Sequence, residues 1–238
     1  MTGAFLMYFQ HSSAIWSEHP DLAAGAVFAT GIGGDVSVDS RIAKFCALAE
    51  ARLATSSESE FPEIQAWRRT FSKMGLKPTQ YRCASESLLR RFRKERSLPR
   101  IHPLIDLCNA ISLAFAIPVA VFDVADVTAS LEVRHAHGDE DYLTFSGEHE
   151  NPDANEVIFA DAAGRAHARR WTNRQSGLSA VRDTTATVLI VAEAMHASAA
   201  ADVSELTATV ADELAGVWPV ITKSATLSPS TPRFDLPL

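Results

Sequence analysis

The chain has 238 residues, of which 47% are hydrophobic and 21% charged, and its formal net charge is −7. These values are typical of a globular domain with a substantial core, and no apolar run approaches the roughly 20 residues of a membrane-spanning helix. The N-terminal sequence lacks the basic start and long apolar core of a secretory signal, so we expect a cytoplasmic protein. Three scattered cysteines, Cys46, Cys83 and Cys108, are too few for a disulfide framework or a zinc site.

Residues 1–80 predict a mixture of α and β structure. We expect a strand at residues 26–30, a glycine turn after it, and helices at residues 40–53 and 60–73, where apolar residues recur at helical spacing. A glycine turn between a strand and a helix can bind a dinucleotide. The third glycine of the G-x-G-x-x-G pattern would fall at Val36, however, so this interpretation fails.

The next segment predicts a helix with a strongly basic outer face. Ser85 can cap a helix that begins at Glu86, whose carboxylate suits the positive end of the helix. Residues 82–100 hold seven basic residues against two acidic ones, which gives +5 in an otherwise acidic chain. Segregated charge of this kind can steer a polyanion, although a solvated face would show the same pattern. The basic side chains that point outward are Arg90, Arg91, Arg93 and Lys94.

A second helix, at residues 104–115, combines an apolar face with a polar flank. Asp106, Asn109 and Ser112 lie three residues apart, which aligns them along one side of the helix. Asp and Asn have poor helix propensity, so another role is expected for them. Asp106 can hold the preceding loop by hydrogen bonds to its backbone, and Asn109 either does the same or lines a pocket.

The rest of the chain predicts short strands, then a long segment and a helix. The short strands are expected at residues 131–134, 142–146, 156–160 and 167–171. Residues 185–195 form a buried strand or helix, and residues 202–217 an amphipathic helix. The tail is either mobile or docks as an extended arm. Since no repeat or clear linker is present, we expect one compact α+β domain in which mixed and antiparallel sheets pack against helices.

Neither a metal site nor an activated nucleophile stands out. His135 and His137 precede an acidic run at residues 139–141, but this segment is typical of an exposed hairpin turn, so no metal is expected. Ser176-Gly177 lacks the first glycine of a nucleophile elbow. The polar run at residues 171–177 and the pair Thr184-Thr185 instead offer neutral donors, which can stabilise an oxyanion or orient a water molecule. An ordinary polar turn would look similar.

Several separated motifs keep a shared order and spacing. Residues 81–91 are YRCASESLLRR, residues 106–113 are DLCNAISL, and P-V and F-D follow at residues 118–119 and 122–123. LEVR, EVIF and RWTNRQS then occupy residues 131–134, 156–159 and 170–176. On these motifs the chain resembles the B3/B4 domain, the editing module in the β subunit of phenylalanyl-tRNA synthetase, and particularly its free-standing relatives. The resemblance covers roughly residues 60–200.

Two departures from the family pattern stand near these motifs. His102 replaces a frequent Asn, and the turn at residues 139–141 is more acidic than usual. The resemblance implies the B3/B4 editing-domain fold at residues 61–218. Residues 1–60 would be an α/β extension of the same compact unit, and residues 219–238 a C-terminal tail.

The resemblance also implies a function. A free-standing copy would act in trans, hydrolysing the ester of mischarged tRNA with a positioned water and neutral donors, and without a cofactor. Its partner would be the aminoacylated 3′ end of tRNA, with loose association with a synthetase and no role for DNA or a membrane. Catalytic positions would be Asn109, Thr184 and Thr185. The substrate pocket would contain Arg82, Glu86, Trp171, Asn173, Arg174 and Glu193, with Glu193 receiving the substrate α-ammonium. Arg90, Arg91, Arg93 and Lys94 would contact tRNA phosphates.

Two other classes of function remain open at this point. The chain can be an RNA-binding module that kept the fold and lost hydrolysis. It can also bind or hydrolyse an amino-acid-like small molecule in the same pocket. The deacylase and the RNA-binding module both predict salt-sensitive binding of tRNA, and only the deacylase releases free amino acid.

Overall fold

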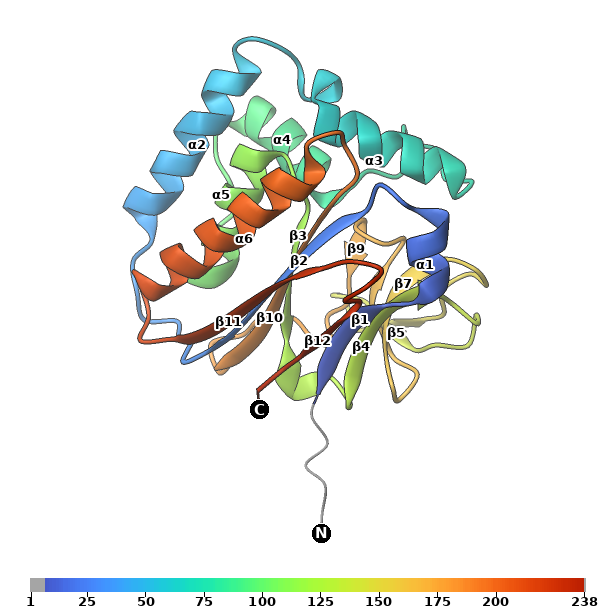
Figure 1. Cartoon of the computed structure of the whole chain (residues 1–238). Coiled ribbons are helices and arrows are strands. Elements are labelled where there is room, and N and C mark those ends of the chain that lie inside the picture. Colours follow the sequence, from blue (N-terminus) through green and yellow to red (C-terminus); the bar gives the residue numbers. More distant parts are fainter. Residues whose placement is uncertain (1–6, 238) are drawn as a thin grey trace.

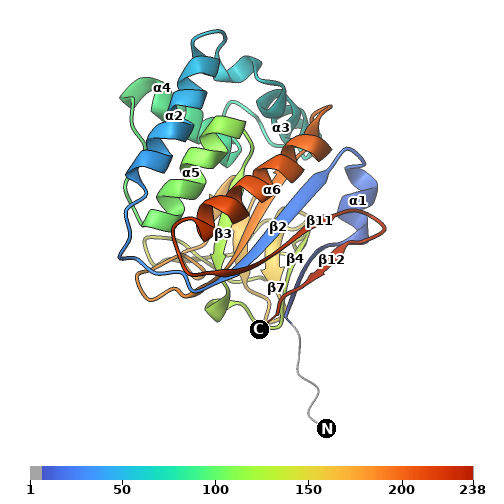
Figure 2. The ribbon, with the colours of Figure 1, turned by 60° about the vertical axis from the view of Figure 1, so that its left-hand side comes forward.

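The computed structural model describes residues 7–237, in which a four-stranded sheet is covered by helices on one face and by a six-stranded sheet on the other (Figure 1). The four-stranded sheet is antiparallel throughout, in the order β11 (Ile221–Leu227), β2 (Ala23–Thr30), β10 (Thr187–Ala194) and β3 (Val119–Asp123). Helices α5 (Pro103–Phe115) and α6 (Ala199–Ala215) lie along its outer face, and α2 (Asp39–Leu53) packs against α5 (Figure 2).

The six-stranded sheet combines parallel and antiparallel pairs. Its strands, in order, are β12 (Arg233–Asp235), β1 (Tyr8–His11), β4 (Ser130–His135), β7 (Val157–Asp161), β8 (Ala166–Arg169) and β9 (Arg174–Gln175). Strands β1 and β4 are parallel, and the other neighbours are antiparallel. A two-stranded hairpin, β5 (Tyr142–Leu143) with β6 (His149–Glu150), lies beside this sheet. The expected α+β class with mixed and antiparallel sheets is therefore confirmed.

The remaining helices complete the core. They are α1 (Ser13–Glu18), α3 (Pro62–Lys73) and α4 (Ala84–Glu95), with two short 3₁₀ turns at Glu58–Glu60 and Val124–Asp126. Aromatic side chains of α3 and α4, including Trp67, Phe71 and Phe92, belong to the same buried core as residues of both sheets. No helix within residues 7–237 is both long and apolar enough to cross a membrane.

Strand β10 has a nearly continuous apolar sequence because both of its faces are buried. Val188 and Ile190 contact the helical layer, whereas Leu189 and Val191 face the other sheet. Alternation continues along the strand, so Glu193 also faces the space between the sheets. Of the two forms expected for residues 185–195, the strand is the one that occurs, and it carries a carboxylate into the core.

The start of α4 differs from the sequence-based expectation. The helix begins at Ala84, and Ser85 is fully buried inside its first turn, so the prediction that Ser85 caps a helix beginning at Glu86 is wrong. The amide of Ala84 donates to the carbonyl oxygen of Thr172 at 2.8 Å. A distant turn therefore satisfies one of the amides that the first turn of a helix leaves without a partner inside the helix.

The first and last described segments of the chain join the sheets. The C-terminal segment, expected to be mobile or to dock as an extended arm, forms β11 along β2 and β12 along β1. Strand β1 in turn pairs with β4, and β2 with β10. The segments at residues 7–30 and 221–235 thus contribute strands to the same two sheets as the middle of the chain.

Candidate functional site

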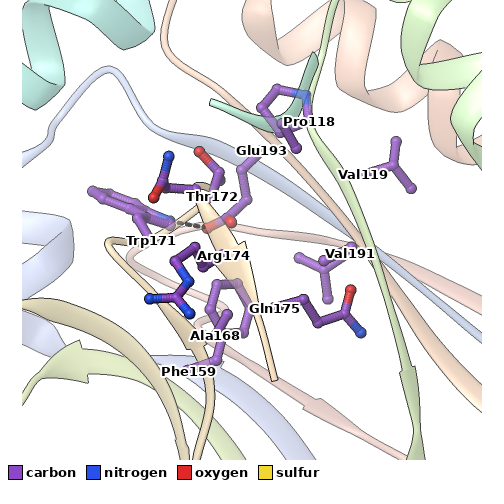
Figure 3. A pocket seen from close by; sticks show the side chains of 13 residues that line it. Pro118, Val119, Phe159, Ala168, Trp171, Thr172, Arg174, Gln175, Val191 and Glu193 are labelled. Carbon is purple, nitrogen blue, oxygen red and sulfur yellow. Dashed lines mark hydrogen bonds between the residues drawn. The ribbon is translucent and has the colours of Figure 1, made fainter. Parts of the chain in front are cut away.

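A small cavity lies where the edges of the two sheets meet at the start of α4 (Figure 3). Its volume is about 70 Å³, which is room for a few water molecules. Strands β3 and β10 supply one wall, through Val119, Ala120 and Val191. The opposite wall comes from Phe159, Ala168 and the segment at residues 171–175. These walls are largely apolar, and one carboxylate, that of Glu193, faces the space between them.

Glu193 is 2% exposed, and its hydrogen bonds fix one of its two carboxylate oxygens. Oε1 accepts from the indole nitrogen of Trp171 at 2.9 Å and lies 2.6 Å from Nε2 of His11. The indole nitrogen of Trp67 donates to the backbone oxygen of Glu193 at 3.3 Å. Within residues 7–237 no side chain or amide donates to Oε2. The carboxylate is therefore held rigidly and retains an acceptor for a ligand.

His11 connects this carboxylate to the N-terminal strand. It is the last residue of β1, and its side chain is enclosed by the rings of Phe9 and Trp16 at centroid distances of 5.2 and 5.0 Å. Its Nδ1 atom is buried without a hydrogen-bond partner in the described part of the chain. Since a protonated Nδ1 would leave a buried donor unpaired, this environment favours the ring proton on Nε2, where it donates to Glu193.

The turn after β8 places the Trp171 indole against Glu193. Arg170 and Trp171 both have left-handed backbones, with φ of 47° and 57°. Such backbones cost non-glycine residues about 1–3 kcal/mol each and occur where surrounding structure enforces them. The Trp171 amide donates to the Val157 carbonyl at 2.7 Å, and its ring packs edge-on against Trp67 and His19 at 5.2 and 4.9 Å. Burial, followed by the nearby Lys73, lowers the pKa of His19, so that ring is largely uncharged at neutral pH.

The polar residues of the predicted pocket fall into two groups. Trp171, Asn173, Arg174 and Glu193 line the cavity. Arg82 and Glu86 lie behind it: the Asn173 side-chain amide donates to the Arg82 carbonyl at 2.7 Å. The buried carboxylate of Glu86 pairs with Arg68 at 2.6 Å and with Arg82 at 3.3 Å. This pair of arginines braces the start of α4 and leaves Glu86 no free oxygen toward the cavity.

The three predicted catalytic residues are not among those that line the cavity. Asn109 is half-buried on α5, a helix on the far side of the four-stranded sheet. Thr184 is exposed. The Thr185 hydroxyl is committed to local structure, because it donates to the Asp123 carboxylate at 2.6 Å and accepts from the Arg182 amide at 2.9 Å. Asp106, which lies three residues before Asn109 on α5, accepts from the Ile101 amide at 2.8 Å and so holds the loop that precedes the helix.

The cavity also contains residues that sequence reasoning missed. The Thr172 hydroxyl is buried there and has no hydrogen-bond partner among residues 7–237. Gln175 lines the same wall, and its side-chain amide donates to the Val121 carbonyl at 2.6 Å. Both belong to the polar run at residues 171–177, so the sequence located the segment but not which hydroxyl faces inward. His11 gave a weaker signal, a single imidazole in a four-residue strand.

The basic face of α4 is largely neutralised by ion pairs. Glu58, 1% exposed, pairs with Arg93 at 2.8 Å and with Arg90 at 3.3 Å. Arg91 pairs with Glu95 at 2.8 Å. Lys94 has no ion pair within the described chain. Three of the four residues expected at tRNA phosphates thus already hold a carboxylate, which reduces the positive charge that this helix presents.

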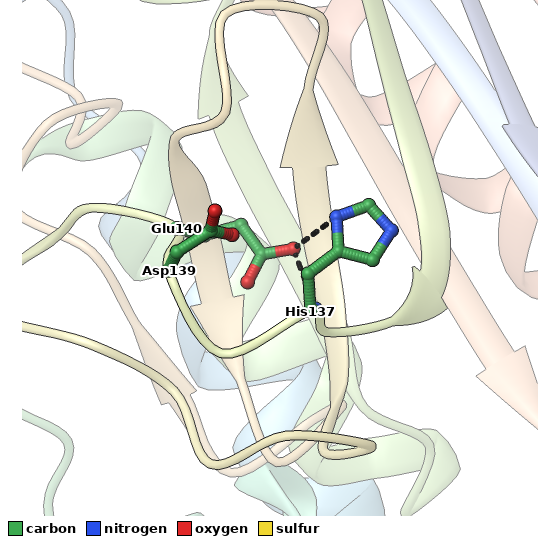
Figure 4. A group of neighbouring side chains, drawn as sticks. All are labelled: His137, Asp139 and Glu140. Carbon is green, nitrogen blue, oxygen red and sulfur yellow. Dashed lines mark hydrogen bonds and ion pairs between the residues drawn. The ribbon is translucent and has the colours of Figure 1, made fainter.

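His137, Asp139 and Glu140 form a cluster whose possible ligand atoms lie within 4.8 Å of one another (Figure 4). The Glu140 carboxylate is already bound by the Arg134 guanidinium at 2.5 Å and by the amides of His137 and Gly138. Burial alone would raise the pKa of Glu140, but these hydrogen bonds outweigh it and bring the pKa to about 2. Glu140 therefore has a structural role in closing the turn; it is buried, whereas His137 and Asp139 are exposed.

The family model described as the B3/4 domain matches residues 66–214, more than half of the 238-residue chain. The chain belongs to the B3/4 domain family. The matched segment of this B3/4 protein contains every residue that lines the cavity, whereas His11 lies outside it. Glu193 thus has one partner, Trp171, within the family segment and another on the N-terminal strand.

Comparison with solved structures finds an N-terminal fragment of the phenylalanyl-tRNA synthetase β subunit from Pyrococcus horikoshii. The two are 9% identical with a TM-score of 0.47, and the match covers 92% of this chain and 54% of that one. This B3/4 protein thus spans about half the length of the synthetase fragment. No curated protein matches the sequence.

Proposed function

We propose that this B3/4 protein is a free-standing deacylase that hydrolyses the ester bond of mischarged tRNA. Membership of the B3/4 family supports a relation to the synthetase editing module. The observation that carries the proposal is the Glu193 carboxylate, buried at the cavity with Oε1 fixed by Trp171 and His11 and with Oε2 open. An aminoacyl ester carries an α-ammonium, and a preorganised carboxylate in an apolar site is a suitable acceptor for it.

The proposed substrate pose follows from the cavity walls. With its ammonium at Glu193, the amino acid directs its side chain against Ala120, Ala168 and Val191. The small volume, about 70 Å³, suits a small side chain better than an aromatic one. The ester then lies toward the wall that contains Thr172 and Arg174, which leads to the ribose.

Hydrolysis in this pose requires orientation and neutral donors. Water adds to the ester carbonyl, the carbonyl oxygen gains negative charge, and the C–O bond to the ribose breaks as the ribose oxygen takes up a proton. The vicinal ribose hydroxyl can assist that proton transfer. The Thr172 hydroxyl, which has no other partner in the described chain, and the Arg174 guanidinium can stabilise the developing oxyanion. Because an aminoacyl ester is already activated, positioning contributes much of the rate without a covalent intermediate.

A second candidate is a binder of amino-acid-like small molecules. The specific observation that favours it is the basic helix α4, where Arg90, Arg91 and Arg93 hold carboxylates of the same chain and offer reduced charge to a polyanion. Such a protein would bind a free amino acid at Glu193 with the same fold and cavity. It would neither require tRNA nor release amino acid from it.

A deacylation screen separates these candidates. Purified protein is incubated with a panel of mischarged tRNAs, and release of free amino acid is measured for the wild type, Glu193→Gln and Thr172→Val. Glu205→Gln, a change at an exposed carboxylate on α6, serves as the matched control. We expect release by the wild type and the control, strongest for small amino acids, and much slower release by the two cavity variants. Silence across the panel, together with saturable binding of a free amino acid, would favour the second candidate.

A further inference from the structure

A second hollow, of about 370 Å³, opens directly beside the cavity. The two share Arg174 and Gln175, so strand β9 is the wall between them. The far side of the hollow is the loop of the β5–β6 hairpin, from Thr144 to Ser146. A substrate group that leaves the cavity past Arg174 would therefore enter this hollow.

Phe145, in that loop, is 74% exposed. Burying an aromatic ring is favourable, so an exposed ring marks a place where a partner can gain contact. The hydroxyls of Thr144 and Ser146 flank it, and the other large apolar side chains that are exposed within residues 7–237, Leu48, Ile101 and Ile221, lie outside this hairpin. An exposed single ring with a polar rim is suited to a flat, polar-edged ligand and is poorly suited to the apolar core of a protein interface.

The loop that carries Phe145 is fixed. Its backbone closes through the Gly147 amide and the Thr144 carbonyl at 3.1 Å, and through the Thr144 amide and the Glu148 carbonyl at 2.8 Å. The hairpin is also tied to the strand beside the cavity, since the Leu143 carbonyl accepts from the Ser176 hydroxyl at 2.8 Å and from the Gly177 amide at 2.9 Å. Because the backbone of the loop is already fixed, only the side chain of Phe145 loses conformational freedom when a ligand stacks on its ring.

Arg174 adds a second planar group to the hollow. Its guanidinium lies 5.3 Å from the ring centroid of Tyr142, and its side chain is 40% exposed. Unstacked nucleic-acid bases are bound between aromatic rings and Arg guanidinium planes, and every base has a face that can stack. The pairing of an exposed Phe with a half-exposed Arg beside an aminoacyl cavity matches this mode of recognition.

We propose that Phe145 and Arg174 form a stacking site for the terminal nucleobase of the RNA whose aminoacyl group occupies the Glu193 cavity. The inference rests on the proposed function, because it takes the ester-linked ribose to lie at the β9 wall. It assigns recognition of the aminoacylated end of the RNA to the β5–β6 hairpin, a surface distinct from the basic helix α4. Phe145 is a positioning residue: it holds the ribose in place and touches no reacting atom.

The test uses an RNA hairpin that ends in C-C-2-aminopurine, whose fluorescence is quenched when the base stacks. The full chain is titrated into this RNA as the wild type, Phe145→Ala, Phe145→Tyr and Ile221→Ala. Ile221 is also 74% exposed, but it lies on β11, so it is a matched control for losing an exposed apolar side chain. We expect quenching by the wild type, Phe145→Tyr and the control. Phe145→Ala should raise the dissociation constant about 5- to 150-fold, the range for one base–aromatic stack.

A second readout separates this inference from the proposed function. With mischarged tRNA, kcat/KM should fall by the same factor in Phe145→Ala, whereas hydrolysis of the corresponding amino-acid ethyl ester, which has no base, should be unchanged. If the wild type deacylates tRNA and Phe145→Ala matches it in both assays, the stacking site is refuted while the proposed function stands. If the wild type neither quenches the probe nor deacylates tRNA, both are refuted.

Discussion

The contact between His11 and Glu193 can be tested by a double-mutant cycle. His11→Phe removes the imidazole donor that lies 2.6 Å from Oε1, and it keeps a ring that can pack against Phe9 and Trp16. A hydrogen bond to a charged group is worth about 1.5–3 kcal/mol, so the unfolding free energy should fall by about that amount. In the Glu193→Gln background the acceptor is neutral, and the same change should cost about 0.5–1.5 kcal/mol.

The two effects predict a coupling free energy of about 1 kcal/mol or more between the two positions. Urea denaturation of the wild type, both single variants and the double variant, followed by circular dichroism, measures it. Trp171 remains in all four proteins and provides the constant second donor. If the two changes are additive within about 0.5 kcal/mol, His11 does not hold the carboxylate and the description of the site is refuted.

Three further changes test other parts of the molecule. Ala168→Leu should fill the cavity and abolish deacylation at a stability cost of about 1–3 kcal/mol, measured by activity and urea denaturation; full activity would contradict the position of the site. Lys94→Ala should reduce the slope of log affinity for tRNA against log salt concentration by about 0.7–0.9 without changing the melting temperature. Arg93→Ala should instead lower the melting temperature, because it leaves the buried Glu58 with one partner fewer. Glu140→Gln should destabilise the protein at neutral pH. Since the pKa of Glu140 in the folded state is lowered from 4.5 to about 2, the difference in unfolding free energy from the wild type should shrink as the pH falls through that window. A difference in unfolding free energy that is independent of pH would contradict the role of Glu140.

The sequence predicted the larger elements well because their periodicity is strong. The helices expected at residues 40–53, 60–73 and 104–115 correspond to α2, α3 and α5, and the strand expected at residues 26–30 lies within β2. The boundary of α4 was wrong because the amide of Ala84 is bonded by Thr172, a residue far away in sequence. Contacts of this kind leave no local pattern to detect.

The candidate site was predictable only in part. Trp171, Asn173, Arg174 and Glu193 were expected at a pocket and line one. His11 was not found, because a single imidazole in a short strand has no recognisable role until the two sheets pack together and bring His11 of β1 against Glu193 of β10. On the basic helix α4, by contrast, the sequence predicted more than the structure shows. Counting charges predicted a positive face, but two of its arginines pair with the buried Glu58, and this pairing depends on how the chain folds.

The central claim is that Glu193 binds the α-ammonium of an aminoacyl ester, and N-acetylation of the substrate tests it most directly. Deacylation rates are measured for one mischarged tRNA and its N-acetylated form, with the wild type and Glu193→Gln. Loss of a hydrogen bond to a charged group should slow the wild type about 10- to 100-fold on the acetylated substrate, and Glu193→Gln should treat the two substrates nearly alike. Equal rates of the wild type on both substrates would contradict the account.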